Sequence, residues 1–158
     1  MNMRSILTAT ALGLAVVIAS AFPSFAQSNP LLGTWKLNVE KSKNNSGTLA
    51  RSQISVYSQD GQNYKNTSKG VDYQGKPFET ILLHIYDGQP HPTTGSPFYD
   101  SSTYTKIDDH TIFWSRSKAG KQVLIGYLVL APDGKTYTTT NMTTLGKGGS
   151  DIAVNERQ

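Results

Sequence analysis

The sequence predicts an all-β domain, an antiparallel up-and-down meander of about eight or nine strands that closes into a barrel or sandwich. Runs rich in Thr, Tyr, Val and Ile, which favour strands, fill most of the chain after residue 26. Turn signals interrupt these runs every 8 to 14 residues or so. The clearest are Asp60-Gly61, Gln74-Gly75, Asp87-Gly88 and Asp133-Gly134. No long helical periodicity is present in this part of the sequence.

The N-terminus has the pattern of a secretory signal peptide. Arg4 precedes an uncharged apolar run over residues 6–22, and Ser24-Phe25-Ala26 supplies the small residues of a cleavage site. A membrane anchor would need about 18 to 20 apolar residues, and Pro23 and Ser24 interrupt the run too early. We therefore expect a signal peptide over residues 1–26 and a periplasmic or secreted domain over residues 27–158. No stable membrane insertion is expected after cleavage.

The composition limits how the domain can be stabilised and which classes of partner it is expected to bind. The chain has no cysteine, so packing and strand pairing must stabilise the domain instead of disulfides. Its net charge of +4 is spread along the sequence, without a basic stripe interleaved with aromatic residues. A nucleic-acid partner is therefore not expected.

Alternation assigns faces to the strands in order. Trp35, Leu37 and Val39 point to one side of the first strand, and Ile54 and Val56 alternate with Ser55 and Tyr57 in the second. The runs 78–86 and 123–130 are apolar on both faces, which predicts strands covered on both sides or facing a cavity. The Thr-rich run 135–144 is predicted to be a half-exposed strand.

The connections also carry information. Residues 41–50 are polar and are predicted to form a long loop or a short helical turn. Residues 89–97 contain three prolines and a glycine, so we expect an irregular connection of the kind that borders a cavity mouth. Gly126 interrupts an otherwise strong strand and is expected to mark a bulge or a sharp bend.

The start of the domain carries a family resemblance. Gly33-Thr34-Trp35 at the entry to the first strand is similar to the opening of lipocalins and their fatty-acid-binding relatives. In those proteins the Trp closes one barrel end, and a basic residue after the last strand packs across its ring. The resemblance implies the same closing role for Gly33, Trp35 and Arg157, with Arg157 stacking on Trp35.

A longer pattern resembles a group of small exported bacterial lipocalin-like proteins, a group without an established biochemical activity. The matching segments are Tyr86-Asp87-Gly88, Pro92-x-Thr94-Gly95-x-Pro97 and Pro132-Asp133-Gly134-Lys135-Thr136. The resemblance covers nearly all of residues 27–158 and implies a lipocalin-like barrel. The chain departs from lipocalins in lacking a Thr-Asp-Tyr block, a C-terminal helix and a disulfide, so the fold transfers better than the ligand class.

Such a barrel is expected to hold a small apolar or amphipathic ligand, with interior aromatics lining the cavity and a few polar groups orienting the ligand. The candidate cavity or mouth residues are Phe78, Leu82, His84, Tyr86, Phe98, Tyr104, Trp114 and Tyr127.

The sequence contains no motif that indicates a particular enzymatic reaction. His84, His91 and His110 are not spaced for chelation, so neither a metal nor a cofactor is expected. A Gly-x-Ser-x-Gly elbow is absent, and Asp108-Asp109 suits a hairpin tip. No catalytic residue is assigned.

Two alternatives to the ligand carrier remain. One is an interaction module of the cell envelope that uses the 89–97 loop and an exposed aromatic face. The other is a barrel enzyme of isomerase or hydrolase type, which would require His84 and a carboxylate to meet inside a cleft.

Overall fold

The computed structural model describes residues 29–158, and the expected signal peptide, residues 1–26, lies outside this range. The described chain forms ten strands joined in one antiparallel sheet. They are β1 (Gly33–Asn44), β2 (Ser52–Asp60), β3 (Asn63–Val71), β4 (Pro77–His84), β5 (His91–Pro92), β6 (Ser101–Lys106), β7 (Thr111–Lys118), β8 (Lys121–Leu130), β9 (Thr136–Thr143) and β10 (Gly149–Arg157).

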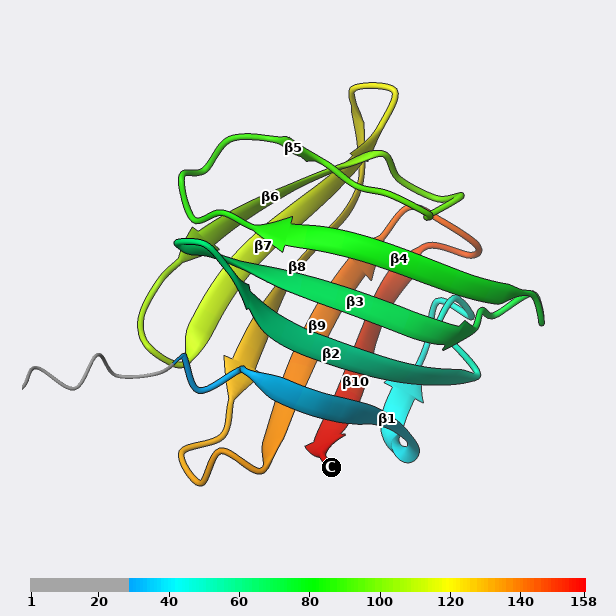
Figure 1. Ribbon diagram of the computed structural model, residues 1–158. Coiled ribbons are helices and arrows are strands. Elements are labelled where there is room, and N and C mark those ends of the chain that lie inside the picture. Colours follow the sequence, from blue (N-terminus) through cyan, green and yellow to red (C-terminus); the bar gives the residue numbers. More distant parts are fainter. Residues whose placement is uncertain (1–28) are drawn as a thin grey trace, which may run out of the picture.

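The strands form an up-and-down meander that curls into a nearly closed barrel (Figure 1). Each strand from β1 to β4 and from β5 to β10 pairs with its neighbour in sequence, and β1 pairs with β10. Between β4 and the segment after β5, two backbone hydrogen bonds join Ile81 and Thr94, at 2.9 and 3.1 Å. The antiparallel meander predicted from the sequence is confirmed.

The strand count differs from the expected eight or nine because the proline-rich connection contributes one short strand. His91 and Pro92 pair with Ser102 and Ser101 of β6, so the segment between β4 and β6 is partly ordered as β5.

The expected loop or helical turn over residues 41–50 is wrong for its first four residues, which continue β1. The pairing of β1 with β10 shifts register between Asn38 and Lys43 and then resumes through Asn44. This bulge also changes which side chains face inward. Val39, expected on the same face as Trp35 and Leu37, is 46% exposed.

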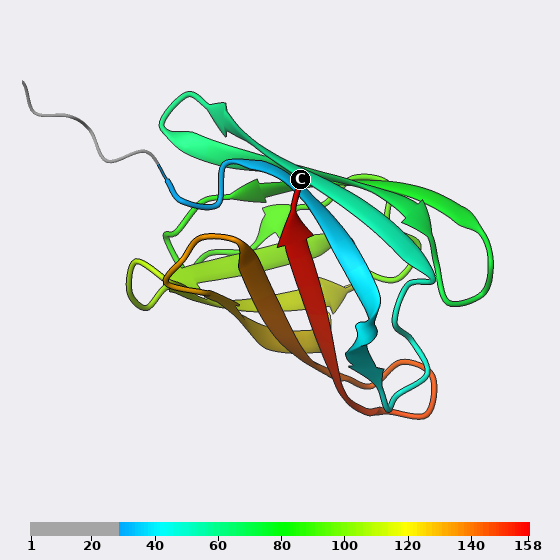
Figure 2. The ribbon, with the colours of Figure 1, turned by 90° about the horizontal axis from the view of Figure 1, so that it is seen from below.

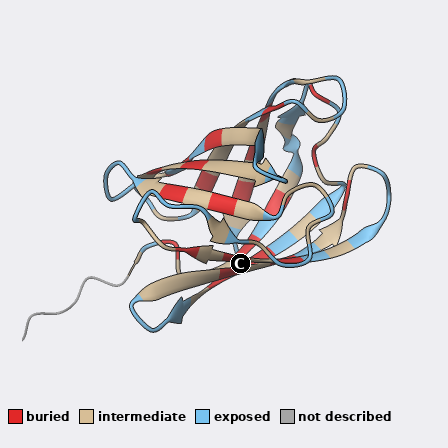
Figure 3. Cartoon of the chain, turned by 90° about the horizontal axis from the view of Figure 1, so that it is seen from above, coloured by how far each residue is buried: buried red, intermediate tan, exposed pale blue. Residues whose placement is uncertain are grey.

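Buried residues are distributed over the strands (Figure 3), and the buried hydrophobic side chains form one large cluster and a smaller one of Leu37, Leu49 and Ala153. Trp35 belongs to the large cluster, near the start of β1, and is fully buried; its ring lies edge-on to Tyr137 with centroids 4.8 Å apart. The other members of this cluster are Leu31, Tyr57, Tyr104, Ile112, Trp114, Leu128 and Leu130. We call this cluster of aromatic and aliphatic side chains the aromatic plug.

Arg157 covers the plug from outside, where the end of β10 lies beside the start of β1 (Figure 2). Its guanidinium carbon is 4.3 Å from the centre of the Trp35 ring. Its nitrogens donate hydrogen bonds to the carbonyl oxygens of Pro30, Leu32 and Gly134. Gly33 leaves room for this stack, because its φ is +127° and a Cβ there would lie 2.7 Å from an Arg157 nitrogen. The guanidinium of Arg157 therefore lies over the Trp35 ring.

Gly126 has a different role from the bulge or bend expected. It pairs in regular register with Trp114 of β7 and Asn141 of β9, and the bulge of β8 lies earlier, next to Arg116 and Ser117. A Cβ at Gly126 would lie 2.6 Å from the Trp114 ring and 2.1 Å from the Thr140 carbonyl oxygen. The missing side chain therefore makes space for Trp114 inside the barrel.

Among residues 29–158, no helix is long and apolar enough to cross a membrane.

Candidate ligand-binding cavity

A cavity of about 200 Å³ occupies the barrel interior on the side away from the Arg157 stack. Its floor is the aromatic plug, with Tyr57, Tyr104, Trp114 and Tyr137 contributing to the wall. Apolar side chains from several strands and connections line the rest, including Leu37, Leu49, Phe78, Leu82, Phe98, Leu124 and Leu145. The volume lies below the roughly 300–1,000 Å³ of sites for drug-sized ligands, so the cavity suits a smaller molecule.

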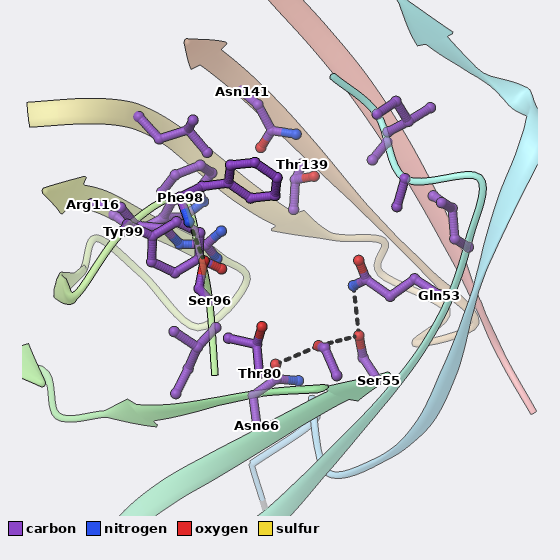
Figure 4. Close-up of a pocket in the computed structure, with 18 of the residues that line it drawn as sticks. Gln53, Ser55, Asn66, Thr80, Ser96, Phe98, Tyr99, Arg116, Thr139 and Asn141 are labelled. Atoms are coloured by element: carbon purple, nitrogen blue, oxygen red, sulfur yellow. Dashed lines mark hydrogen bonds between the residues drawn. The ribbon is translucent and has the colours of Figure 1, made fainter. Parts of the chain in front are cut away.

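Two connections border the mouth of the cavity. Residues 96–99, which follow the short strand β5, contribute Ser96, Phe98 and Tyr99 to the lining (Figure 4). The Phe98 ring lies 5.3 Å from the ring of Tyr73, which belongs to the turn between β3 and β4. This aromatic contact joins two loops across the edge of the mouth.

Most of the candidate residues from the sequence face this cavity. Six of the eight line it: Phe78, Leu82, His84, Phe98, Tyr104 and Trp114.

Tyr86 and Tyr127 lie elsewhere. Tyr86 lines a second hollow, of about 280 Å³, which is formed with Leu31 and Ile112 at the plugged end. Tyr127 is 43% exposed on the outer face of β8, where its ring contacts Phe113 at 5.2 Å. It does not line the cavity, because the inward positions of β8 are Leu124, Gly126, Leu128 and Leu130.

His84 lies deep in the wall, enclosed by tyrosine rings. Its imidazole stacks on Tyr104 with centroids 4.0 Å apart and meets Tyr57 edge-on at 5.3 Å. Burial lowers the pKa of His84 to about 3, and the nearby positive charge of Arg116 acts in the same direction. The imidazole is therefore neutral at physiological pH.

The phenol groups of the floor are neutral as well. Burial raises the pKa of Tyr137 to about 12 and raises the pKa of Tyr57 well above its usual value. These rings supply apolar surface and neutral hydroxyl groups, and no negative charge.

Arg116 of β7 is the main cavity residue that sequence reasoning missed. Its guanidinium carbon lies 4.5 Å from the centre of the Trp114 ring and 4.6 Å from that of Tyr99. It shares the inward face of β7 with Ile112 and Trp114. A cation at alternate spacing with two buried apolar residues was the available signal.

A chain of hydrogen bonds runs along the opposite wall, on β2 and β3 (Figure 4). The Gln53 amide donates to the Ser55 hydroxyl at 2.8 Å, and the Ser68 hydroxyl donates to Oδ1 of Asn66 at 2.8 Å. Because Ser68 uses its only proton on Asn66, the Ser55 hydroxyl must donate to Ser68 across the 2.8 Å between them. This series of hydrogen bonds ends at Oδ1 of Asn66. The amide nitrogen of Asn66 has no acceptor of its own and can donate into the cavity.

The cavity wall holds every buried side-chain polar atom that lacks a hydrogen-bond partner within residues 29–158. These atoms are Nδ2 of Asn66, Nδ1 of His84, the hydroxyl of Tyr104, Nε of Arg116 and Oδ1 of Asn155. Leaving such groups unsatisfied is costly, so native proteins seldom do so away from water or a ligand. Water or a bound molecule in the cavity would satisfy these groups.

The two carboxylates of the lining are already occupied. Asp72 accepts hydrogen bonds from the backbone nitrogens of Gln74 and Lys76, at 2.9 and 2.8 Å. Asp151 accepts from the backbone nitrogen of Ser46 at 2.8 Å and from the hydroxyls of Ser46 and Thr48. Both are thus committed to turns at the cavity rim.

The residues described offer no metal centre: within 29–158, no group of three or more His, Asp or Glu side chains is placed to hold an ion. His91 forms an exposed pair with Asp87, with 3.0 Å between the ring nitrogen and the carboxylate. His110 lies at the second hollow, away from His84.

No protein-family model matches the chain, and no curated protein matches it in sequence. Among solved structures it is similar to two redesigned beta barrels. One is 15% identical, with a TM-score of 0.49, covering 82% of this chain and 92% of that one. The other, bound to DFHBI, is 12% identical, with a TM-score of 0.44, covering 82% and 95%.

Lobster apocrustacyanin A1 is also similar, at 18% identity and a TM-score of 0.45, covering 84% of this chain and 63% of that one.

Proposed function

We propose that this protein is an exported lipocalin-like barrel that binds a small apolar or amphipathic ligand in its interior, without acting on it chemically. The observation that carries the proposal is the cavity of about 200 Å³, walled by apolar side chains and by five unpartnered polar atoms. Apolar surface supplies affinity in such sites, and a few polar groups fix orientation.

The surroundings of His84 argue for binding over catalysis. The neutral imidazole is packed between aromatic rings, and no carboxylate of residues 29–158 forms an ion pair with it. The two carboxylates of the cavity lining, Asp72 and Asp151, accept hydrogen bonds from backbone nitrogens in turns. The acid–base pair that a barrel enzyme would need is therefore not assembled.

The first test is native mass spectrometry of the protein purified from its own host, followed by organic extraction. A reproducible small molecule that dissociates on extraction supports the carrier function. A clean protein mass, together with no binding of an apolar fluorescent probe, contradicts it.

A matched pair of variants assigns the ligand to the cavity. Thr139 of β9 lines the cavity, and Thr140 beside it is exposed on the outer face. Thr139→Phe should fill the cavity and abolish ligand retention, whereas Thr140→Phe should retain the ligand. Equal retention by both variants would place the ligand outside the barrel.

A second candidate function is an interaction module of the cell envelope. Its supporting observation is the outer surface of β8 and β9, where Tyr127, Val129 and Met142 are 43%, 48% and 44% exposed. Exposed apolar clusters favour protein contacts. Loss of an envelope partner in cross-linking after Tyr127→Ser, with ligand binding intact, would support this function.

Export itself is part of the proposal, supported by the signal-peptide pattern of residues 1–26. N-terminal sequencing of the protein from the periplasm or the medium should give a chain that begins at Gln27. Recovery of the uncleaved chain from the cytoplasm would contradict it.

A further inference from the structure

We infer that the second hollow, of about 280 Å³, binds a small organic cation that carries methyl groups on its ammonium nitrogen. The hollow is separate from the interior cavity, so the inference goes beyond the proposed carrier function and does not depend on it. It starts from the observation that two tyrosine rings line this hollow together with a carboxylate that forms no ion pair within residues 29–158.

The hollow lies where the turn between β6 and β7 meets residues 29–31 at the start of the described chain (Figure 1). Its floor is apolar, because Leu31, Ile112 and Leu130 of the aromatic plug are 4%, 5% and 2% exposed. Such a floor is unfavourable for a strongly hydrated ion, which would have to lose water without replacement. An ion whose own surface is apolar meets no such cost.

The rings of Tyr64 and Tyr86 form the wall beside this floor, with centroids 6.3 Å apart and planes inclined at 48°. Tyr64 lies near the start of β3 and Tyr86 follows the end of β4, so two paired strands hold the rings in place. Burial raises the pKa of Tyr86 to about 12, so its phenol is neutral. Neutral aromatic rings attract a quaternary ammonium group through their electron-rich faces.

The charges at the rim favour a cation. Lys106 is the one Lys or Arg among the described residues that line the hollow, and Asp109 pairs with its ammonium at 2.7 Å. Asp108 is left without an ionic partner in the described chain. Its Oδ1 accepts a hydrogen bond from the backbone nitrogen of His110 at 2.8 Å, which lowers the pKa of the carboxyl and keeps it ionised. With His110 neutral, the rim therefore carries one negative charge in excess.

The test compares choline with 3,3-dimethylbutan-1-ol, a neutral molecule of the same shape in which carbon replaces the charged nitrogen. The protein is titrated with each at pH 8, where imidazole is neutral, and at low ionic strength, because salt screens exposed carboxylates. The NMR signals of the Tyr64 and Tyr86 rings report binding. Choline should bind about ten-fold tighter or more. This comparison needs no variant, so it stands even if a substitution impairs folding.

Potassium chloride provides a second comparison. The potassium ion has the charge of choline without its methyl groups, so at equal concentration it should leave the two ring signals unchanged. This separates recognition by the aromatic wall from a general attraction of cations to the rim carboxylates.

Variants then locate the effect. Tyr64→Leu should weaken choline binding several-fold and change 3,3-dimethylbutan-1-ol binding by less than about two-fold, whereas Tyr64→Phe should retain most of the choline affinity. Asp108→Asn should also weaken choline binding several-fold, while its remaining Oδ1 can still accept the turn hydrogen bond. The matched control is Asp133→Asn. Oδ1 of Asp133 accepts the same kind of turn hydrogen bond, from the backbone nitrogen of Lys135 at 2.9 Å, and Asp133 lies outside both linings.

Four results would overturn the inference. Equal affinity for choline and 3,3-dimethylbutan-1-ol would remove the role of charge, and equal shifts with potassium would remove the role of the rings. Choline binding that persists in both Tyr64→Leu and Asp108→Asn would place the cation elsewhere. Failure of choline to bind at all would refute this site and leave the carrier function of the interior cavity untouched.

Discussion

The guanidinium carbon of Arg157 lies 4.3 Å from the centre of the Trp35 ring, while its nitrogens donate hydrogen bonds to three backbone carbonyl oxygens. One side chain thereby ties together the N-terminal segment, the turn that contains Gly134 and the end of β10. Arg157, near the C-terminus, thus fixes the position of residues 30–32 before β1.

Replacing Arg157 should loosen this end of the barrel. Arg157→Ala removes the cation–π contact and three hydrogen bonds, so we expect the free energy of unfolding to fall by about 1–3 kcal/mol. Urea denaturation followed by Trp fluorescence measures this. Lys121→Ala, at an exposed hairpin position, is the control and should change stability by less than about 0.5 kcal/mol. Equal effects of the two substitutions would deny the closing role of Arg157.

Adding a side chain at Gly126 should disturb the packing of Trp114. The new Cβ of Gly126→Ala would lie within 2.6 Å of the Trp114 ring, so strand or ring must shift at a cost of about 1–3 kcal/mol. Thermal unfolding and the near-ultraviolet circular dichroism of Trp114 report the change. Thr140→Ala, on the exposed outer face of β9, should leave both signals unchanged. An unaltered Trp114 signal in Gly126→Ala would refute the close contact.

His84 should make stability depend on pH. The pKa of His84 is lowered from 6.5 to about 3 in the folded protein, so the unfolded chain binds the proton first as the pH falls. The contribution of His84 is therefore fully present above about pH 6.5. It is lost on acidification toward pH 3, at up to about 1.4 kcal/mol per pH unit.

Two measurements check this dependence. The free energy of unfolding between pH 6.5 and 4 should vary less steeply in His84→Phe than in the natural chain. The imidazole nitrogen shifts of His84 should stay those of a neutral ring down to about pH 4. A titration of His84 near pH 6 would contradict the burial of its imidazole.

The contact between Phe98 and Tyr73 should slow ligand exchange. Phe98→Ala removes the ring that meets Tyr73 at 5.3 Å across the cavity edge, so a bound apolar fluorescent probe should dissociate several-fold faster. Stopped-flow displacement measures the rate. Phe113→Ala removes an aromatic ring from the outer surface instead and should leave the rate unchanged. An equal rate in both variants would exclude residues 96–99 from the ligand's path.

Local chemistry made the meander predictable. Asp-Gly and related turns separate strands whose alternation is clear. The contact of Arg157 with Trp35 was expected from the resemblance to lipocalins and not from local chemistry. The inward face of β1 could be assigned up to Leu37, but the bulge beyond Asn38 depends on pairing with β10, which a sequence does not display.

It was harder to predict which face of a strand points into the barrel where both faces are apolar. Tyr127 and Leu128 are equally plausible interior residues from sequence, and only the packing of Trp114 over Gly126 decides which parity faces inward. In β2 the small polar Ser55 faces inward while Ile54 and Val56 are 39% and 42% exposed, against the usual pattern. Ser55 can face inward because it lines the cavity and its hydroxyl is hydrogen-bonded to Gln53 and Ser68.

Arg116 illustrates the same difficulty. One arginine on a strand usually indicates a solvent-facing position, and its significance comes from Tyr99, Trp114 and the absence of a paired carboxylate among the residues described. The first of these partners lies in an irregular connection. No periodicity in the sequence places that segment over β7.

The two hydrogen bonds between Ile81 and Thr94 give the barrel a seam. Every other junction between neighbouring strands, apart from the two-residue pairing of β5 with β6, is a ladder of at least four residue pairs. Separating the barrel wall therefore breaks the fewest hydrogen bonds beside β4. A transient opening there would expose β4 as a free edge strand. Such an edge can recruit a strand from another molecule, so crowding in a concentrated compartment would favour strand-exchanged oligomers that start from this line.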